Sequence, residues 1–453
     1  MASQNRVLFI SHDTVGPRMA GPGIRYFHLA RVLAQHASVT LAAPAGSQLD
    51  PSWPFATATY TIGDWPSIAG QVAATDICVL PSAATYYFPQ LLDSNTYRVV
   101  DGYDPLMAEW LASQAHREEP EMLTDWQLHA TLLHGQYLGG DFYICASERQ
   151  RDWWLGLLEA NGRLNPATYR ADPSLRTLVD VVAYGLPPGT PRATRSVVKN
   201  VWPGIGTADK VILWGGGLWP WLDPLTAIRA VARLWERRED IRLIFPGTVH
   251  PNPIVASMPN HNVDARAEAE RLGLLDRGVF FGEWIAYEDW PNVLLESDLA
   301  LSLHFDTLET RLAFRSRVLE YIWAGLPIVA TRGDATSELV SHFDLGHVVG
   351  YGDVDGVARA IEVLLAEPTT CRAEQFQHAR DMLAWERVAQ PLIDFCRQPY
   401  HAADRETLPF SVGAPYYQGQ LDQLRSLVAG YENGRFMRTM RRLRRLFARG
   451  STL

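Results

Sequence analysis

Residues 313–331 read AFRSRVLEYIWAGLPIVAT. The segment VLEYIWA has apolar residues at helical spacing, and Gly325 suits the C-terminal end of a helix because glycine adopts a left-handed backbone without strain. The apolar run that follows, with its β-branched residues, predicts a buried strand. Arg315 and Arg317 stand at the expected N-terminus of the helix, which is already the positive end of the helix dipole. Two cations at this position predict a bound anion nearby.

The 453-residue chain repeats this alternation of helices and short apolar strands throughout its length. We expect strands at residues 6–10, 38–44, 76–81, 97–105, 141–148, 210–217, 241–247, 278–284, 298–304, 326–331 and 345–350. Such alternation predicts parallel sheets with helices on both faces. The expected fold class is therefore α/β, with two doubly wound Rossmann-like domains at 1–195 and 205–395 that face a cleft. A helical tail is expected at 396–453. Ligands of such folds bind at the carboxyl ends of the strands.

Composition and charge narrow the class of protein. The formal net charge of −9 speaks against nucleic acid as a partner, and the first residues, MASQNRVLFISHD, lack the apolar core of a signal peptide. No window approaches the roughly 20 apolar residues of a membrane span. Four cysteines far apart in sequence fit free thiols in a reducing cytoplasm. The acidic pair Asp353 and Asp355 opens a helix, where acidic residues are common, so we expect no metal site there.

The C-terminus departs from the acidic average. Residues 435–449, RFMRTMRRLRRLFAR, contain seven arginines with apolar residues between them at helical spacing. Two interpretations stay open for this basic amphipathic helix. It packs on its own protein, or it contacts a membrane surface or a partner.

Several segments resemble one enzyme family. RVLEYIWAGLPIVATRGDATSELV (317–340), VVAYGLPPG (181–189), WGGGLWPWLDPLTAIRAV (214–231) and DFYICASERQRDWWLGLLEANGRLNP (141–166) are similar to retaining GT-B glycosyltransferases of the large group-one or family-four type, in a bacterial subgroup. The resemblance covers about residues 5–395. It implies metal-independent transfer of a sugar from a nucleoside-diphosphate donor to an acceptor hydroxyl, with retention, in bacterial glycan or glycoconjugate synthesis. The acceptor would be a sugar, a lipid-linked compound or another small molecule. The place would be the cytoplasm, or the inner face of the membrane if the basic helix contacts it.

The resemblance assigns roles around the opening stretch. A helix N-terminus offers free N–H groups to a diphosphate, and Arg315 and Arg317 would add charge-assisted bonds. Glu320 matches the family's ribose-binding glutamate. The family's second glutamate, eight residues earlier, is replaced by Leu312, and whether Glu309 substitutes for it stays open. The family's cations after the first strand of the second domain are also missing, where this chain has three consecutive glycines.

Loops at other strand ends complete the expected site. The glycine loop before residue 25 resembles the family's mobile loop, and Asp101 or Asp104 would orient the acceptor hydroxyl. Asp334 would meet sugar hydroxyls or cap the next helix. The expected catalytic residues are Asp101, Asp104 and Arg315. The expected donor-binding residues are Gly21, Gly23, Arg25, Gly215, Gly216, Gly217, Arg315, Ser316, Arg317, Glu320, Asp334 and Glu338.

Three alternatives remain at this point. A nucleotide-sugar epimerase of the same architecture would convert the donor without an acceptor. A catalytically inactive relative would act as a partner protein, an alternative that the Leu312 departure keeps open. A dinucleotide-dependent oxidoreductase ranks lowest, because the glycines lack the G-x-G-x-x-G spacing.

Overall fold

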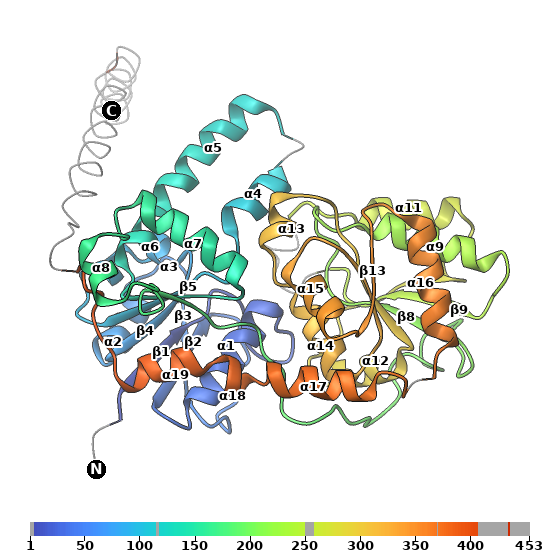
Figure 1. Cartoon of the computed structure of the whole chain (residues 1–453), viewed down its shortest axis with the longest axis horizontal. Coiled ribbons are helices and arrows are strands. Elements are labelled where there is room, and N and C mark those ends of the chain that lie inside the picture. The colour runs from blue at the N-terminus through green and yellow to red at the C-terminus, as the bar shows by residue number, and fades with distance from the viewer. Residues whose placement is uncertain (1–3, 115–116, 250–257, 369, 406–433, 435–453) are drawn as a thin grey trace, which may run out of the picture.

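The computed structural model describes residues 4–114, 117–249, 258–368, 370–405 and 434, which form two α/β domains side by side (Figure 1). Each domain is built on one parallel sheet with helices on both faces. The α/β class and the two doubly wound domains predicted from the sequence are therefore confirmed.

The N-terminal sheet has seven strands in the order β3-β2-β1-β4-β5-β6-β7. They are β1 (Arg6–Ile10), β2 (Ser38–Pro44), β3 (Ala56–Tyr60), β4 (Ile77–Pro81), β5 (Tyr97–Asp101), β6 (Phe142–Cys145) and β7 (Val179–Val181). Its helices are α1 (Gly21–Leu33), α2 (Pro66–Ala73), α3 (Ala84–Tyr87), η1 (Pro89–Asp93), α4 (Leu106–Gln114), α5 (Glu119–Leu132), α6 (His134–Gly139), α7 (Glu148–Ala160) and α8 (Pro166–Ala171). The central strands β1 and β4 are buried almost throughout, as expected of strands covered on both faces.

The C-terminal sheet has six strands in the order β10-β9-β8-β11-β12-β13. They are β8 (Lys210–Trp214), β9 (Ile241–Phe245), β10 (Val279–Phe281), β11 (Leu299–Ser302), β12 (Ile328–Thr331) and β13 (Gly346–Val349). Its helices are α9 (Pro224–Trp235), α11 (Asn262–Arg271), α12 (Trp290–Glu296), α13 (Leu308–Leu312), α14 (Ser316–Ala324), α15 (Ala335–His342) and α16 (Val354–Ala366). The opening stretch forms α14, the turn at Gly325 with φ of 73°, and β12.

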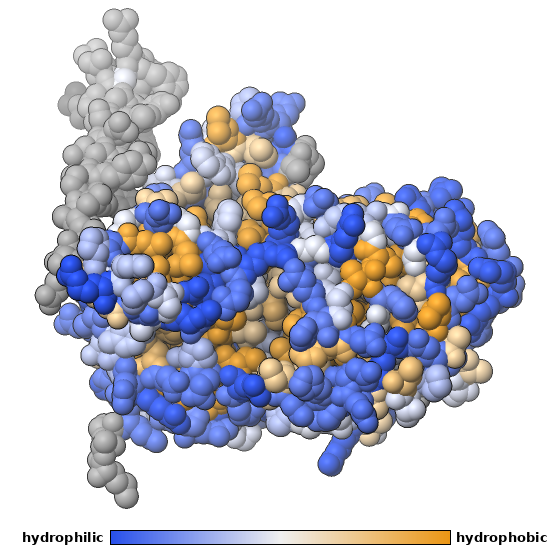
Figure 2. All heavy atoms as spheres, viewed as in Figure 1, coloured by the Kyte–Doolittle hydropathy of each residue, from blue (hydrophilic) through white to orange (hydrophobic). Residues whose placement is uncertain are grey.

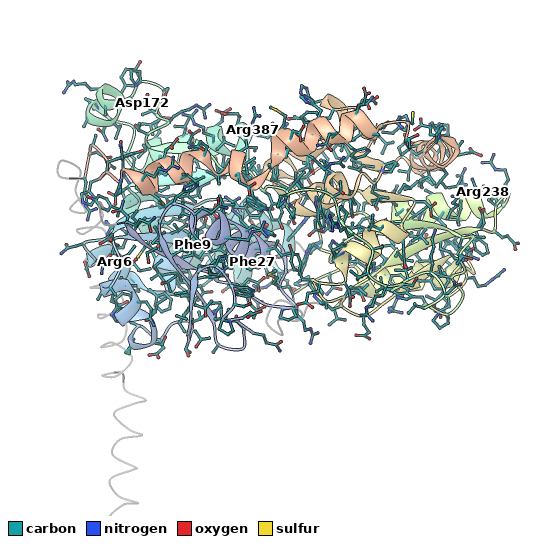
Figure 3. All side chains as sticks on the ribbon, turned by 90° about the horizontal axis from the view of Figure 1, so that it is seen from below. Arg6, Phe9, Phe27, Asp172, Arg238 and Arg387 are labelled. Atoms are coloured by element: carbon teal, nitrogen blue, oxygen red, sulfur yellow. The ribbon has the colours of Figure 1, made fainter. Side chains whose placement is uncertain are left out.

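The last helices run along both domains, as the view in Figure 3 shows. They are α17 (Ala373–Leu383), α18 (Trp385–Val388) and α19 (Gln390–Arg397). Helix α17 packs on α14 of the second domain, whereas α18 packs on α1 of the first. The chain then reaches Asp404, which forms a buried ion pair with Arg163 at 2.7 Å. The chain from α18 onward therefore returns to the N-terminal domain.

The basic segment 435–449 lies outside the described residues, so its helix stays a prediction. Within the described ranges, no helix is both long and apolar enough to cross a membrane.

Candidate active site

A cavity of about 470 Å³ lies between the two domains. Figure 2 shows apolar residues gathered in the hollow between the two halves of the molecule. Loops after β1 and β5 line the cavity from the first domain, and the loop after β8 and the start of α14 line it from the second. Several strands thus end at the same place, which is the usual ligand site of such sheets.

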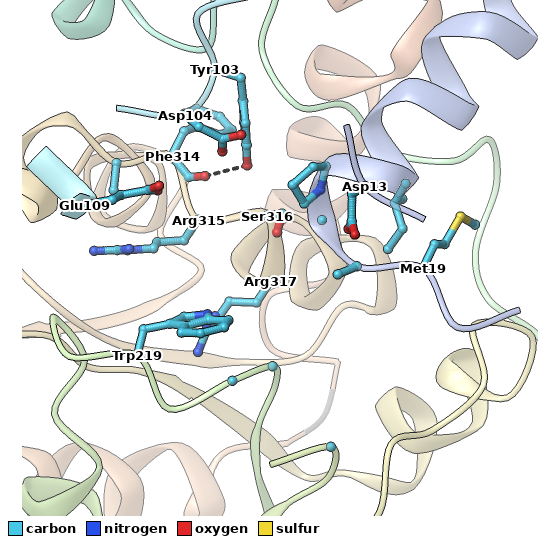
Figure 4. Close-up of a pocket in the computed structure, with 18 of the residues that line it drawn as sticks. Asp13, Met19, Tyr103, Asp104, Glu109, Trp219, Phe314, Arg315, Ser316 and Arg317 are labelled. Carbon is cyan, nitrogen blue, oxygen red and sulfur yellow. Dashed lines mark hydrogen bonds between the residues drawn. The ribbon is translucent and has the colours of Figure 1, made fainter. Parts of the chain in front are cut away.

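Hydrogen bonds between the domains border this cavity. The hydroxyl of Tyr103 donates to the carbonyl of Phe314 at 2.8 Å, a contact drawn in Figure 4. The amide of Tyr287 donates to the carbonyl of Pro17 at 2.7 Å. Gln150 donates to the carbonyl of Leu312 at 2.8 Å. The two halves of the cleft are therefore held together by hydrogen bonds to backbone carbonyls close to the predicted site.

The structure brings eight of the predicted residues to the cavity. These are Gly21, Asp104, Gly216, Gly217, Arg315, Ser316, Arg317 and Glu320. The others that the sequence suggested do not line it. These are Gly23, Arg25, Asp101, Gly215, Asp334 and Glu338.

Arg315 has a carboxylate partner within the protein. Its two terminal nitrogens donate to the two oxygens of Glu309 at 2.6 and 2.7 Å, and its Nε lies 3.5 Å from Asp334. The Arg315 and Glu309 side chains are 7% and 1% exposed. A bidentate pair of this kind satisfies the guanidinium in a planar geometry. The anion that Arg315 requires, at the position just before α14, is therefore supplied by Glu309 of α13.

Arg317 has no such partner. It forms no ion pair with any described residue, and its Nη1 is buried without a hydrogen-bond acceptor. The guanidinium lies 6.0 Å from the ring centre of Trp214, and a Cβ placed on Gly216 would come within 3.2 Å of Nη2. Burial lowers the pKa of Arg317 from its usual value. A cation that is desolvated, unpaired and open to a cavity beside a helix N-terminus is arranged to receive an anion.

Glu320 lies one turn further along α14. Its Oε2 accepts a hydrogen bond from Trp290 Nε1 at 2.8 Å. Burial raises the pKa of Glu320 to about 7, although the Trp290 bond and Arg317 act in the opposite direction. This carboxyl group therefore changes its protonation near neutral pH, at the wall of the cavity.

Arg25 and Asp101 have a different role from the one expected. The guanidinium of Arg25 donates to both oxygens of Asp101, at 2.7 and 3.0 Å, and to the carbonyl of Val182 at 2.9 Å. Both side chains are buried, at 1% and 2% exposed. The pair fixes α1 to the end of β5 and leaves no atom open to the cleft. The expectation that Arg25 contacts the donor and that Asp101 contacts the acceptor is therefore wrong.

Local contacts also explain why Asp334, Glu338 and Gly215 do not line the cavity. Asp334 caps α15 by accepting from the amide of Ser337 at 2.6 Å, which confirms the capping alternative. Glu338 is exposed and pairs with Arg149 of the first domain. The amide of Gly215 donates to the hydroxyl of Tyr321 at 2.7 Å, and this side of the glycine turn faces the core.

Sequence reasoning missed a group of residues on the opposite wall. Glu109 on α4 and His12 after β1 line the cavity together with Asp104. Figure 4 shows Glu109 and Asp104 in the pocket. Burial raises the pKa of Asp104 to about 6, and burial followed by the charges of Asp104 and Glu309 raises the pKa of Glu109 well above its usual value. The only sequence signal was the position of α4 directly after β5. Within the described ranges, no group of three or more His, Cys, Asp or Glu is placed to hold a metal ion.

Comparison with known proteins identifies the domain that carries Arg317. Residues 209–367 match the family described as glycosyl transferases group 1. Chitobiosyldiphosphodolichol beta-mannosyltransferase of Debaryomyces hansenii is 28% identical over 75 residues, which are 17% of this chain and 16% of that protein. The match therefore spans less than a fifth of the length of that relative.

Solved structures resemble the chain over both domains. Sucrose-phosphate synthase from Thermosynechococcus elongatus aligns with a TM-score of 0.63 at 15% identity, covering 87% of this chain and 99% of that one. Alr3699/HepE from Anabaena, in complex with UDP-glucose, aligns with a TM-score of 0.61 at 17% identity, covering 86% and 98%. At such identities the likeness shows the fold. The chain thus has the two-domain GT-B fold of these structures, and residues 209–367 match the group 1 glycosyl transferases.

Proposed function

We propose that this chain transfers a sugar from a nucleoside-diphosphate donor to an acceptor hydroxyl, with retention at the anomeric carbon. The observation that carries the proposal is the unpaired guanidinium of Arg317 in the cleft, at the start of α14. The first amides of α14 have no intrahelical acceptor, so they add hydrogen-bond donors to the same place. A diphosphate offers the charge and the oxygens that this place lacks.

The donor would lie across the second domain. Its diphosphate would bind Arg317 and the amides of α14, and Glu320 would accept hydrogen bonds from the ribose hydroxyls. Gly216 leaves room beside Arg317, because a Cβ at this position would come within 3.2 Å of the guanidinium. Gly217 lies against the Trp219 side chain. A similar structure from Anabaena holds UDP-glucose, which supports a nucleotide sugar as the ligand class.

The reaction would form a bond between the acceptor oxygen and the anomeric carbon on the face from which the diphosphate departs. The bond from that carbon to the phosphate oxygen breaks, and the acceptor proton passes to the departing phosphate. Negative charge on the leaving group grows during this step, so Arg317 would stabilise the transition state more than the ground state. Asp104 would orient the acceptor hydroxyl from the opposite wall.

Thermal-shift measurements with UDP, GDP, TDP and ADP, each beside its bare nucleoside and beside NAD, test the proposal. We expect one nucleoside diphosphate to raise the melting temperature of the protein well above the value measured with its bare nucleoside. When acceptors are added, the nucleotide sugar of the same base should be converted and release this nucleoside diphosphate. Stabilisation by NAD alone, or by no nucleotide, would contradict the proposal. Conversion of the sugar without an acceptor would identify an epimerase instead.

The finer assignments rest on the same proposal. We expect the transfer to need no metal, because Arg317 and the helix amides take the place of a cation. We place the enzyme in the cytoplasm, at the inner face of the membrane if segment 435–449 binds anionic lipid. A role in bacterial glycan synthesis follows from the sequence resemblance.

A further inference from the structure

The two walls of the cleft differ in the charged groups that they offer a ligand. The wall from the first domain contributes Asp13, Asp104 and Glu109 and, among the described residues that line it, no lysine or arginine. Both arginines of the cavity come from the second domain, and one of them is already paired with Glu309. A ligand group on the first-domain side therefore meets carboxyl groups and the imidazole of His12, whose Nε2 is 3.8 Å from Asp104.

Glu109 is the unusual member of this wall. No described residue donates a hydrogen bond to its carboxyl group, and its nearest charged neighbours include the carboxyl groups of Asp104 and Glu309. The guanidinium that comes closest, Arg315, is engaged at both terminal nitrogens by Glu309. In Figure 4 the Glu109 carboxyl group points from α4 toward the middle of the pocket. A partly buried carboxyl group without a partner is costly unless a ligand supplies hydrogen bonds.

We propose that Glu109 and Asp104 form the acceptor subsite, and that the acceptor part bound there is an uncharged sugar presenting hydroxyl groups, not a phosphorylated one. The inference rests on the proposed function, because it assigns Arg317 to the donor diphosphate and so leaves the first-domain wall to the acceptor.

The physical reason is the hydrogen-bonding capacity of this wall. A carboxylate accepts hydrogen bonds from hydroxyl groups, and a protonated carboxyl group can both donate and accept. Either form satisfies a sugar hydroxyl. A phosphate in the same place would have no guanidinium or ammonium to pair with, and it would face carboxyl groups at short range. A phosphate without a cationic partner in the cleft is costly, and it is repelled by each carboxyl group that is ionised, so such an acceptor is rejected.

The test uses the full chain with the nucleotide sugar chosen by the thermal-shift panel. Acceptors are offered as matched pairs, namely glucose, mannose and N-acetylglucosamine, each beside its 6-phosphate, and release of nucleoside diphosphate is followed. We expect at least one neutral sugar to accelerate release over water, with kcat/KM about tenfold or more above that of its phosphate. A phosphate used as well as its neutral partner overturns the inference. So does a panel in which no neutral sugar accelerates release although the donor binds.

Two variants separate a binding role from a structural one. Glu109→Ala should raise KM for the neutral sugar about tenfold, the loss expected for hydrogen bonds to a charged group. Glu109→Lys should shift the ratio of rates toward the phosphorylated member of each pair. Glu119→Ala and Glu119→Lys, on the exposed start of α5, are the matched controls and should behave as wild type.

The outcomes also distinguish this inference from the proposed function. If the chain binds no nucleoside diphosphate, the proposed function fails first. If donor affinity is intact in every variant and the ratio of rates does not move in Glu109→Lys, the acceptor lies elsewhere and only the inference fails.

Discussion

Arg315 and Arg317 are two residues apart, yet their replacement by alanine should have opposite consequences. Arg317 makes no ion pair with a described residue, so Arg317→Ala removes a desolvated cation and should leave the unfolding temperature unchanged or slightly higher. It should weaken binding of a nucleoside diphosphate by roughly 1.5–3 kcal/mol, which is about tenfold to 150-fold, because charge-assisted hydrogen bonds to phosphate are lost. Binding of the bare nucleoside should change little.

Arg315→Ala should act mainly on stability. It leaves the Glu309 carboxylate, which is 1% exposed, without its two donors at 2.6 and 2.7 Å. Removing one member of a buried pair costs about 3–5 kcal/mol. The double variant Arg315→Ala with Glu309→Ala should recover much of this loss, because the uncompensated charge is then absent.

Titration calorimetry with the diphosphate and its nucleoside, together with scanning calorimetry, measures both effects. Arg311→Ala is the control, because this side chain is exposed on α13 and forms no ion pair with a described residue. The reasoning is refuted if Arg317→Ala binds the diphosphate as wild type does. It is also refuted if Arg315→Ala is as stable as Arg311→Ala.

Four further predictions concern the walls of the cleft and the C-terminal segment. Because burial raises the pKa of Glu320 to about 7 and its carboxylate accepts from ribose hydroxyls, nucleoside affinity should rise between pH 6 and 8, whereas Glu320→Gln should show a flat profile by calorimetry. The same shift makes Glu320 stabilise the fold below its unfolded pKa and lose that contribution as pH rises through about 7, a trend that Glu320→Gln should lack in thermal melts. Gly216→Ala should weaken diphosphate binding, because φ is 83° and the added Cβ would lie 3.2 Å from Arg317; unchanged affinity in calorimetry would contradict this. Removing residues 430–453 should reduce sedimentation with anionic vesicles at low salt, and equal sedimentation of both forms would favour a packing role for this segment.

The fold was accessible from the sequence because buried parallel strands are continuous apolar runs. Residues 6–10 and 38–44 were predicted with the bounds that the structure has. The edge strand β3, ATATY, was missed because it is half-exposed and has no such run. The helix end at Gly325 was predicted correctly, since it depends only on local backbone chemistry.

The site was less accessible, because a motif gives the residue types and not their partners. Arg25 looked like a ligand for phosphate, but the partner that satisfies it, Asp101, is 76 residues away at the end of β5. Glu109 carried no motif at all, and only the packing of α4 against α13 brings it to the cleft. Long-range pairing of charges decides which residues remain free for a ligand, and it requires the folded structure.

The replacement of the family's second glutamate by Leu312 can now be followed through the structure. The Leu312 side chain is 5% exposed, and its carbonyl accepts from Gln150 of the first domain, so this position serves the contact between the domains. Glu309, one turn earlier on α13, brings a carboxylate to the cavity, but Arg315 neutralises it in a bidentate pair. Glu309 and Arg315 therefore bind each other and are not free to bind a donor. Among the described residues that line the cavity, Arg317 is the cation without an ion-pair partner. In a protein that binds no anion, the buried and unsatisfied Nη1 of Arg317 would only be destabilising, which speaks against an inactive relative. With Leu312 in place of the second glutamate and Arg315 paired with Glu309, Arg317 is the cation that can bind a ligand anion. This arrangement argues for a retained donor site.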